Sequence, residues 1–198
     1  IKLMFDTKKS HISTVVTSEN LSFFLRKKIF FHLVGPVEQV AVIFAEETPT
    51  FFELERHGVI LLTDWSGSKI TNLPKFLFWI DQTHFHFLAS QEGTPGLNHP
   101  DSRPGHYQSE LWKYDVAEFF LLSSDKNRYL EFNLAPNGGW WSSAFCAPLI
   151  PAPGEPLPIP NVQTSAEVNR DGWRARASIP LSWLQKNYGF SKSCLLYT

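Results

Sequence analysis

The sequence has few cysteines, a single methionine and no long apolar run. Its two cysteines are Cys146 and Cys194. Two cysteines are too few for a disulfide framework or a cysteine-based zinc site, although one bridge between them stays open. The longest apolar candidate, residues 29–45, is interrupted by polar residues, glycine and proline. Because a membrane-spanning helix needs roughly 18 apolar residues in succession, we predict no membrane span.

An excess of charge of one sign is also lacking. The 18 basic and 19 acidic side chains leave a formal net charge of -1. Nucleic acids and anionic membrane surfaces are bound by proteins with a basic excess. The charge balance therefore predicts no nucleic-acid partner.

Aromatic residues, in contrast, are abundant. The 198 residues include 17 Phe, 7 Trp and 5 Tyr, which together make up 15% of the chain, and 43% of all residues are hydrophobic. A chain of this length and composition can bury a sizeable core in one domain. The aromatic share exceeds what we expect a core alone to need, so some rings are candidates for ligand binding.

Strand patterns dominate the sequence. Residues 75–80 and 83–88 flank Asp81-Gln82 as a hairpin, and residues 129–134 and 173–179 alternate between apolar and polar side chains. A short helix is predicted after Pro180, and residues 21–45 could form two strands or a strand and a short helix. These patterns indicate an all-β, antiparallel, jelly-roll-like sandwich with little helix. The side chains predicted to face the core are Phe76, Phe78, Phe85, Phe87, Leu130, Phe132, Leu134, Trp173, Ala175, Ala177 and Ile179.

The chain divides unevenly. Residues 1–50 are interpreted as an N-terminal extension or as additional strands, and residues 51–198 as the sandwich domain. Prolines recur from position 148 to position 160. Since proline cannot donate to a strand ladder, this segment is predicted to be a long connection between two strands.

Three stretches together resemble a known family. They are residues 110–120 (ELWKYDVAEFF), 129–138 (YLEFNLAPNG) and 172–181 (GWRARASIPL). In this order they are similar to the family 9 carbohydrate-binding modules and their relatives in the DOMON-like superfamily. The resemblance covers roughly residues 59–184. It implies a β-sandwich that binds an oligo- or polysaccharide without catalysis, favours a secreted or periplasmic location, and leaves membership of a larger assembly open.

The resemblance also implies site residues. Trp112 matches a stacking tryptophan, Glu118 a carboxylate that binds sugar hydroxyls, and Asp115 an acidic position of the same motif. Asn133 falls near a position where the family can carry a basic residue that contacts sugar. The chemistry is suitable, because the C–H groups of a pyranose pack on a flat ring and charge-assisted hydrogen bonds hold its hydroxyls.

The sequence departs from the family in two respects. The family carries a second stacking tryptophan beyond the segment equivalent to residues 179–184, and no tryptophan follows Trp183 here. Trp140 and Trp141 are the candidates to replace it, with Glu131 and Arg174 as further rim residues. Several modules of the family bind calcium, but the sequence has no Asp-rich loop of suitable spacing, so no cofactor is predicted except calcium by resemblance.

Other functions stay open as alternatives. The sandwich could be a structural or interaction domain that has lost the sugar site. A glycoside hydrolase needs two convergent carboxyls, and Asp115 and Glu118, three apart on one strand, are expected on opposite faces, so no catalytic residue is predicted. His84 and His86 could share a metal with ligands from the following loop. Some DOMON-like domains hold haem through a methionine and a histidine. The single methionine here, Met4, lies outside the region of resemblance, so haem is disfavoured.

Overall fold

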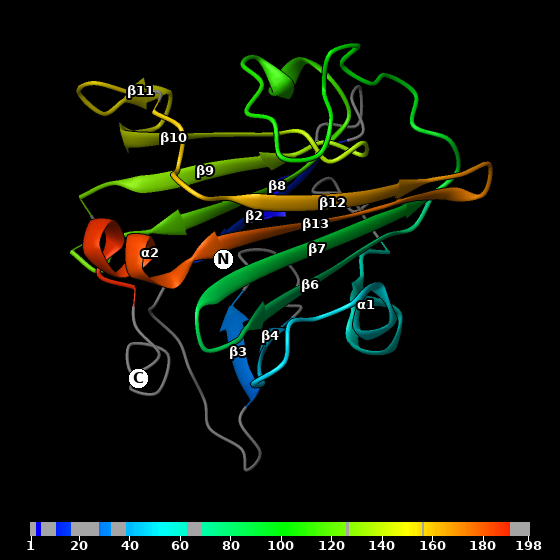
Figure 1. Ribbon diagram of the computed structural model, residues 1–198, viewed down its shortest axis with the longest axis horizontal. Helices are drawn as coiled ribbons and strands as arrows, with labels where there is room; N and C mark the ends of the chain where they lie inside the picture. Colours follow the sequence, from blue (N-terminus) through cyan, green and yellow to red (C-terminus); the bar gives the residue numbers. More distant parts are fainter. Residues whose placement is uncertain are drawn as a thin grey trace.

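The computed structural model describes residues 3–4, 11–16, 28–32, 39–62, 69–125, 127–155 and 157–190, with side chains from residue 42 onward. The described strands form two sheets packed face to face (Figure 1), and the helices that the structure describes are short and lie at the ends of the sheets. The predicted all-β sandwich is therefore confirmed.

The first sheet carries the candidate site. Its strand order is β1 (Leu3–Met4), β2 (His11–Val16), β8 (Val116–Leu122), β9 (Tyr129–Leu134), β10 (Trp140–Ala147) and β11 (Ile150–Pro151). Strands β8, β9 and β10 are antiparallel neighbours, whereas β2 runs parallel to β8.

The second sheet is built around the predicted hairpin. Its strand order is β12 (Gln163–Val168), β13 (Gly172–Pro180), β7 (His84–Glu92), β6 (Pro74–Ile80), β4 (Gln39–Phe44) and β3 (Lys28–His32), and β5 (Val59–Ile60) also pairs with β6. Strand β4 is parallel to β6, and the other neighbours are antiparallel. Strands before residue 50 thus join both sheets, and the proposed domain boundary near that residue stays a prediction.

The core between the sheets is aromatic. The Phe119 ring on β8 lies 5.0–5.7 Å from the ring centroids of four other phenylalanines, which come from β6, β7 and β9. All side chains predicted to face the core are buried, the most exposed being Trp173 at 4%. Among the side chains that the structure describes, more than half of the aromatic rings are therefore buried, and the others are partly or largely exposed.

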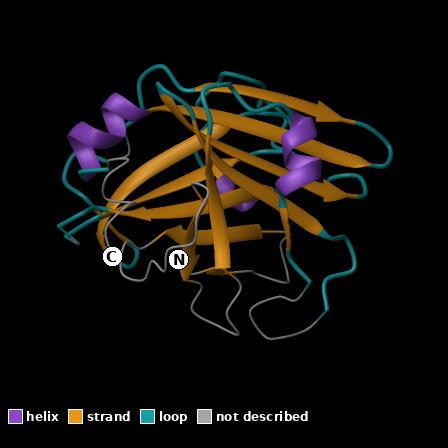
Figure 2. Cartoon of the chain, turned by 90° about the horizontal axis from the view of Figure 1, so that it is seen from below, coloured by secondary structure: helices purple, strands orange, loops and turns teal. Residues whose placement is uncertain are grey.

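Two α-helices lie at opposite ends of the sandwich (Figure 2). Helix α1 (Phe51–His57) begins with a capping box in which the side chains of Thr50 and Glu53 each accept from the other residue's backbone N–H. Helix α2 (Leu181–Tyr188) begins directly after Pro180, as predicted, and ends at Gly189 in the left-handed conformation that glycine favours.

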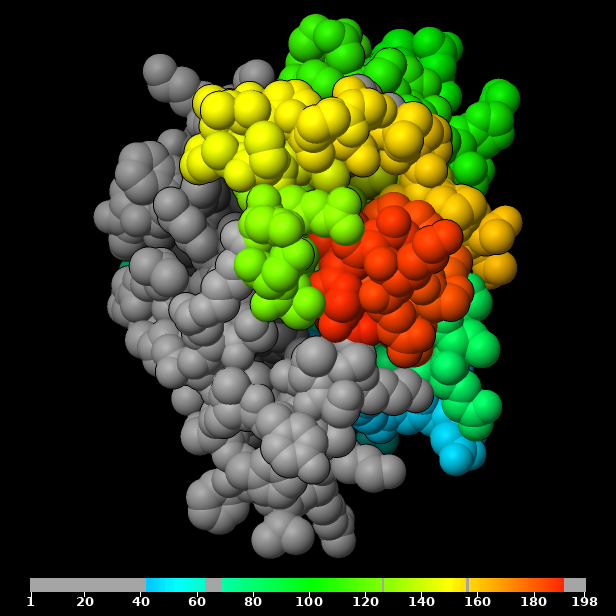
Figure 3. Space-filling view, turned by 90° about the vertical axis from the view of Figure 1, so that its left-hand side faces the viewer, coloured from blue at the N-terminus to red at the C-terminus, as the bar shows by residue number. Residues whose placement is uncertain are grey.

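Helix α2 is fastened to the turn between β8 and β9. The Ser124 N–H donates to the Tyr188 carbonyl at 2.9 Å, Arg128 donates to the Asn187 carbonyl, and the Arg128 guanidinium lies over the Tyr188 ring. Figure 3 shows the helix beside this turn and the proline-rich segment. The described part of that segment connects β10 to β12 and includes β11, as a long connection between strands would.

Two further expectations concern membranes and cysteines. Among the described residues, no helix is both long enough and apolar enough to cross a membrane. Cys146 is an exposed free thiol, and Cys194 lies outside the described residues, so the proposed bridge between the two stays open.

Candidate functional site

The predicted site residues gather mainly on the outer face of the first sheet, which is the face turned away from the core. Cross-strand register places Glu118 opposite Asn133 and Asn133 opposite Trp141. Because side chains alternate along a strand, the next row on this face is Phe120, Glu131 and Ser143, followed by Tyr129 and Phe145. We call these eight side chains the outer face. Only Phe120, Glu131 and Tyr129 are partly exposed, and the other five are buried.

Trp112 stands at one end of the outer face. It belongs to a single 3-10 turn, η1 (Leu111–Lys113), which the fully buried Leu111 anchors. Its side chain is 37% exposed, and its ring meets the buried Trp141 ring edge-on with the centroids 4.6 Å apart. Trp112 is therefore partly exposed to solvent and is held in place by contact with a buried second tryptophan.

Hydrogen-bond acceptors lie next to this ring. Asn133 is completely buried, and its Nδ2 donates to Glu131 Oε1 at 3.0 Å. Its Oδ1 is buried without a hydrogen-bond partner. Since buried acceptors are almost always paired in native proteins, the unpartnered oxygen marks a position where a donor is expected. Glu118, directly opposite on β8, adds a further carboxylate.

The Glu131 carboxyl is electrostatically unusual. Burial raises the pKa of Glu131, and this outweighs the lowering influence of the hydrogen bond from Asn133. The carboxyl consequently keeps its proton to higher pH than an exposed glutamate. Two carboxyl groups and an amide oxygen on one face make the site rich in acceptors and unfavourable for an anionic ligand.

Asp115 makes contacts that the sequence did not predict. Its Oδ2 accepts from the Leu97 N–H at 2.9 Å, and its own N–H donates to the Leu97 carbonyl at 2.8 Å. This reciprocal pair ties the loop of residues 93–105 to the start of β8. Asp115 therefore anchors a loop, whereas Glu118 belongs to the outer face. The two carboxyl groups thus do not share one site.

Replacing Asp115 with alanine is expected to loosen this loop and to lower the free energy of unfolding by about 1–2 kcal/mol, because a charge-assisted hydrogen bond is lost. Asp115→Asn keeps an oxygen that can accept from Leu97 and should cost less. The protection of the Leu97 amide from hydrogen exchange measures this hydrogen bond directly. Equal protection in the wild type and Asp115→Ala would contradict the assignment.

Trp140 and Arg174 do not lie on the outer face. Trp140 is 4% exposed, and its ring stacks on Phe132 in the core with the centroids 5.7 Å apart. Trp141, one residue later, points to the opposite side of the sheet and supports Trp112. Arg174 belongs to β13 in the second sheet, where it pairs with Glu167. Because adjacent residues on a strand face opposite ways, only one of the two neighbouring tryptophans could join the site.

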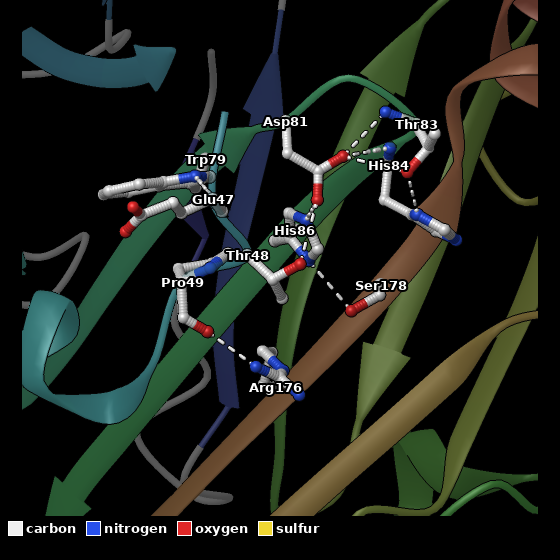
Figure 4. A network of polar contacts seen from close by, with 10 residues as sticks. All are labelled: Glu47, Thr48, Pro49, Trp79, Asp81, Thr83, His84, His86, Arg176 and Ser178. Atoms are coloured by element: carbon white, nitrogen blue, oxygen red, sulfur yellow. Dashed lines mark hydrogen bonds and ion pairs between the residues drawn. The ribbon is translucent and has the colours of Figure 1, made fainter. Parts of the chain in front are cut away.

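A second polar cluster, which the sequence did not predict, lies on the second sheet (Figure 4). His86 is 1% exposed; its Nε2 lies 2.8 Å from Asp81 Oδ2, and its Nδ1 lies 2.8 Å from Ser178 Oγ. Asp81 Oδ1 accepts from the backbone N–H groups of Thr83 and His84. The sequence signal was only a polar hairpin turn followed by alternating histidines.

The protonation of this cluster follows from its partners. An ionised carboxylate only accepts, so Nε2 of His86 carries the proton and Nδ1 accepts from Ser178. Burial lowers the pKa of His86, although the hydrogen bond and charge of Asp81 act to raise it. Burial acts to raise the pKa of Asp81, but the hydrogen bonds from Thr83, His86 and His84 together lower it.

Ser178, His86 and Asp81 are the three residue types of a hydrolytic triad, but the resemblance does not go beyond this composition. Ser178 is 4% exposed in the middle of β13, between β12 and β7, so a substrate cannot reach its hydroxyl. The cluster instead holds the segment before α1, because Thr48 Oγ1 donates to Asp81, and Trp79 Nε1 and Arg176 donate to the carbonyls of residues 47 and 49. Both ring nitrogens of His86 already have hydrogen-bond partners, Asp81 and Ser178. Among the described residues there is no group of three or more His, Cys, Asp or Glu suited to a metal.

Comparisons with known proteins give limited similarity. No family model matches the sequence. Over 54 residues the chain is 39% identical to the "UPF0462 protein C4orf33 homolog" of Rattus norvegicus, a stretch that covers 26% of this chain and 27% of that protein. The match thus spans about a quarter of the relative's length.

Solved structures are similar to this chain at low sequence identity. A family 9 carbohydrate-binding module from Caldicellulosiruptor kristjanssonii in complex with glucose is 16% identical, with a TM-score of 0.45 over 87% of this chain and 69% of that chain. Its complex with cellotriose is 15% identical, with a TM-score of 0.43 over 87% of this chain and 68% of that chain. At these scores neither likeness bears on the function of this chain.

Proposed function

We propose that the protein binds a neutral saccharide on the outer face, without catalysis, with Trp112 as the stacking platform. The observation that carries this proposal is the pairing of a half-exposed tryptophan, supported by Trp141, with the unpartnered buried Oδ1 of Asn133 on the same face. The motifs that resemble family 9 carbohydrate-binding modules support it from the sequence.

The chemistry of the outer face suits a sugar. The axial C–H groups of a pyranose pack on the Trp112 ring, which loses little side-chain entropy on binding. Hydroxyl groups of the sugar donate first to Glu131, which is partly exposed. Glu118 and Asn133 are 8% and 0% exposed, so they accept only if the sugar displaces the atoms that cover them. Because these groups offer acceptor oxygens, a neutral sugar is preferred over one that carries a carboxylate or sulfate.

Titration with soluble gluco- and xylo-oligosaccharides, followed by tryptophan fluorescence and by calorimetry, tests the proposal. We expect binding by the wild type and a loss of roughly fivefold or more in affinity for Trp112→Ala, because a stacked ring contributes on the order of 1 kcal/mol or more. Trp112→Phe keeps a flat ring and should retain most of the affinity.

Two results would overturn the proposal. One is the absence of any response at millimolar sugar, and the other is unchanged affinity in Trp112→Ala. A comparison of glucose oligomers with glucuronate-containing oligomers tests the preference for neutral sugars separately.

The competing function is a structural or interaction sandwich without a sugar site. The observation that favours it is the deep burial of Asn133 and Trp141, which leaves Trp112 as the main exposed ring of the site. This alternative predicts no binding of any saccharide in the same titration, so one experiment separates the two functions.

A further inference from the structure

Strand β12 forms one edge of the second sheet. Among the described strands it pairs with β13 alone (Figure 1). All six of its residues pair regularly with β13, from Gln163 opposite Ser178 to Val168 opposite Trp173. None of the six is buried, and Gln163, Glu167 and Val168 are exposed. A second strand can therefore reach this edge from solvent.

The alternation of hydrogen bonds shows which backbone groups of β12 point away from the sheet. At the turn into β13, the Asn169 N–H donates to the Gly172 carbonyl at 2.9 Å. Opposite residues in an antiparallel ladder alternate between hydrogen-bonded and non-bonded pairs. Counted back from this bonded pair, Thr164, Ala166 and Val168 fall on non-bonded pairs, so their N–H and carbonyl groups point outward. Within the described part of the chain, these outward groups have no backbone partner.

The loops that contact β12 do so from its inner side. The Gly105 N–H donates to Thr164 Oγ1, and this hydroxyl donates to the Gly138 carbonyl. Gly138 also lies against the Ala166 side chain. Thr164 and Ala166 lie opposite buried alanines of β13, so their side chains point into the sandwich. These contacts therefore involve side chains and leave the backbone edge accessible.

The first sheet, in contrast, has a protected edge at β11. That strand has two residues, one of which is Pro151. The register of β10 with β11 shifts between Phe145 and Ala147. Short length, proline and irregular register are devices that prevent pairing between exposed sheet edges. Strand β12 is longer, contains neither proline nor lysine, and keeps a regular register, so it stays open to pairing.

The sequence of β12 is complementary to itself. Two copies can pair antiparallel about a two-fold axis at Ala166, which aligns the outward backbone groups of both strands. Ser165 then lies opposite Glu167 of the other copy, and its hydroxyl can donate to that carboxylate. Thr164 lies opposite Val168, which matches two β-branched side chains that favour strands.

The charge of the molecule also permits self-association. Within its own chain Glu167 already pairs with Arg174, with the Oε2 and Nη2 atoms 2.5 Å apart. The formal net charge of the whole chain is only -1. Since a large net charge is what keeps identical proteins apart, little repulsion opposes the approach of two copies.

We propose that two copies of this chain pair through β12, so that their second sheets join into one continuous antiparallel sheet. A contact of this symmetry closes after two copies and yields a dimer rather than a fibre. Each copy contributes an edge of only six residues, so the interface is small and the dimer is weak. The proposal goes beyond the saccharide function and does not depend on it, because the outer face belongs to the other sheet.

Sedimentation velocity of the full chain between roughly 1 μM and 1 mM tests the proposal. We expect a monomer–dimer equilibrium in the wild type. Ala166→Pro removes an outward N–H and leaves the bonds to β13, so it should weaken dimerisation roughly tenfold or more. Val168→Lys places a charge at an exposed position of the edge and should also weaken the dimer, without the risk to folding that proline carries. Val168→Thr keeps a β-branched side chain and is the matched control, which should still dimerise.

Hydrogen exchange resolved for single amides supplies an internal control. As the concentration rises, the amides of Thr164, Ala166 and Val168 should become more protected, whereas those of Ser165 and Glu167, which already bond to β13, should not change. A wild type that stays monomeric over the whole range would overturn the proposal. A dimer that persists undiminished in Ala166→Pro and Val168→Lys, or that protects all five amides equally, would show that another surface is used and would overturn it as well.

Discussion

Replacing Phe119 with alanine is expected to lower the free energy of unfolding by about 3–5 kcal/mol, because it leaves a cavity at the centre of the sandwich. Phe119 is completely buried, and its ring contacts Phe78, Phe85, Phe87 and Phe132, which come from both sheets. Since the stability of a whole domain is commonly about 5–15 kcal/mol, this loss is a large share of it. Equilibrium denaturation in urea, monitored by far-UV circular dichroism, measures the change.

The neighbouring Phe120 provides a matched control. It is one residue away on β8 and points to the outer face, where it is only partly buried. Phe120→Ala removes the same group of atoms and should cost clearly less, since part of its surface already contacts water. Equal losses for the two variants would show that the outer face is packed as tightly as the core and would contradict the assigned faces.

Replacing Asp81 with alanine is expected to cost about 3 kcal/mol of stability, because it leaves His86 and several N–H donors without an acceptor. Asp81 is 4% exposed and accepts from Thr48, Thr83, His84 and His86. Asp81→Asn keeps the oxygen that accepts from Thr83 and His84, so it should be less damaging. A loss below 1 kcal/mol for Asp81→Ala would contradict a structural role for the cluster.

The same cluster predicts how stability depends on pH. The pKa of folded His86 is lowered, so below about pH 6.5 an unfolded histidine gains a proton that the folded one does not, and the free energy of unfolding falls. The pKa of folded Asp81 is also lowered, so its contribution is present above about pH 3.9 and is lost progressively as the pH falls further. His84 and Arg176, which also face His86, further disfavour a positive charge on the His86 ring and lower its pKa.

Denaturation between pH 8 and pH 4 measures this dependence. The decline in stability below pH 6.5 should be steeper in the wild type than in His86→Gln, which cannot titrate. The hydrogen exchange of residues 47–49 should increase over the same range, because the cluster holds this segment. Identical pH profiles for the wild type and His86→Gln would contradict the assignment to His86.

The strands of the fold were largely predictable. The sequence predicts the hairpin of β6 and β7 and the strands β9 and β13, because a two-residue period of apolar side chains is a local property of a half-buried strand. Helix α2 was predictable from the proline at its start. The parallel pairing of β2 with β8 was not, since it joins residues distant in sequence and leaves no local pattern.

The candidate site was only partly predictable. Trp112, Trp141, Glu118 and Asn133 lie close together on one face, but the individual binding roles of these residues stay predictions. Asp115 matched a sequence motif and yet anchors a loop, because the decisive partner, Leu97, is 18 residues away. The cluster of Asp81, His86 and Ser178 was missed for the same reason: Ser178 comes from a strand 92 residues beyond His86.

The sequence by itself determined the class of the fold and the core-facing side of β6, β7, β9 and β13, because both follow from alternation over a few residues. Only the tertiary structure decided which polar and aromatic side chains share the outer face. Cross-strand register and loop attachment bring Trp112 to Trp141 and place Tyr129 over Phe145. These contacts depend on how distant strands align, and the free energy of that alignment comes from the whole core rather than from any local segment.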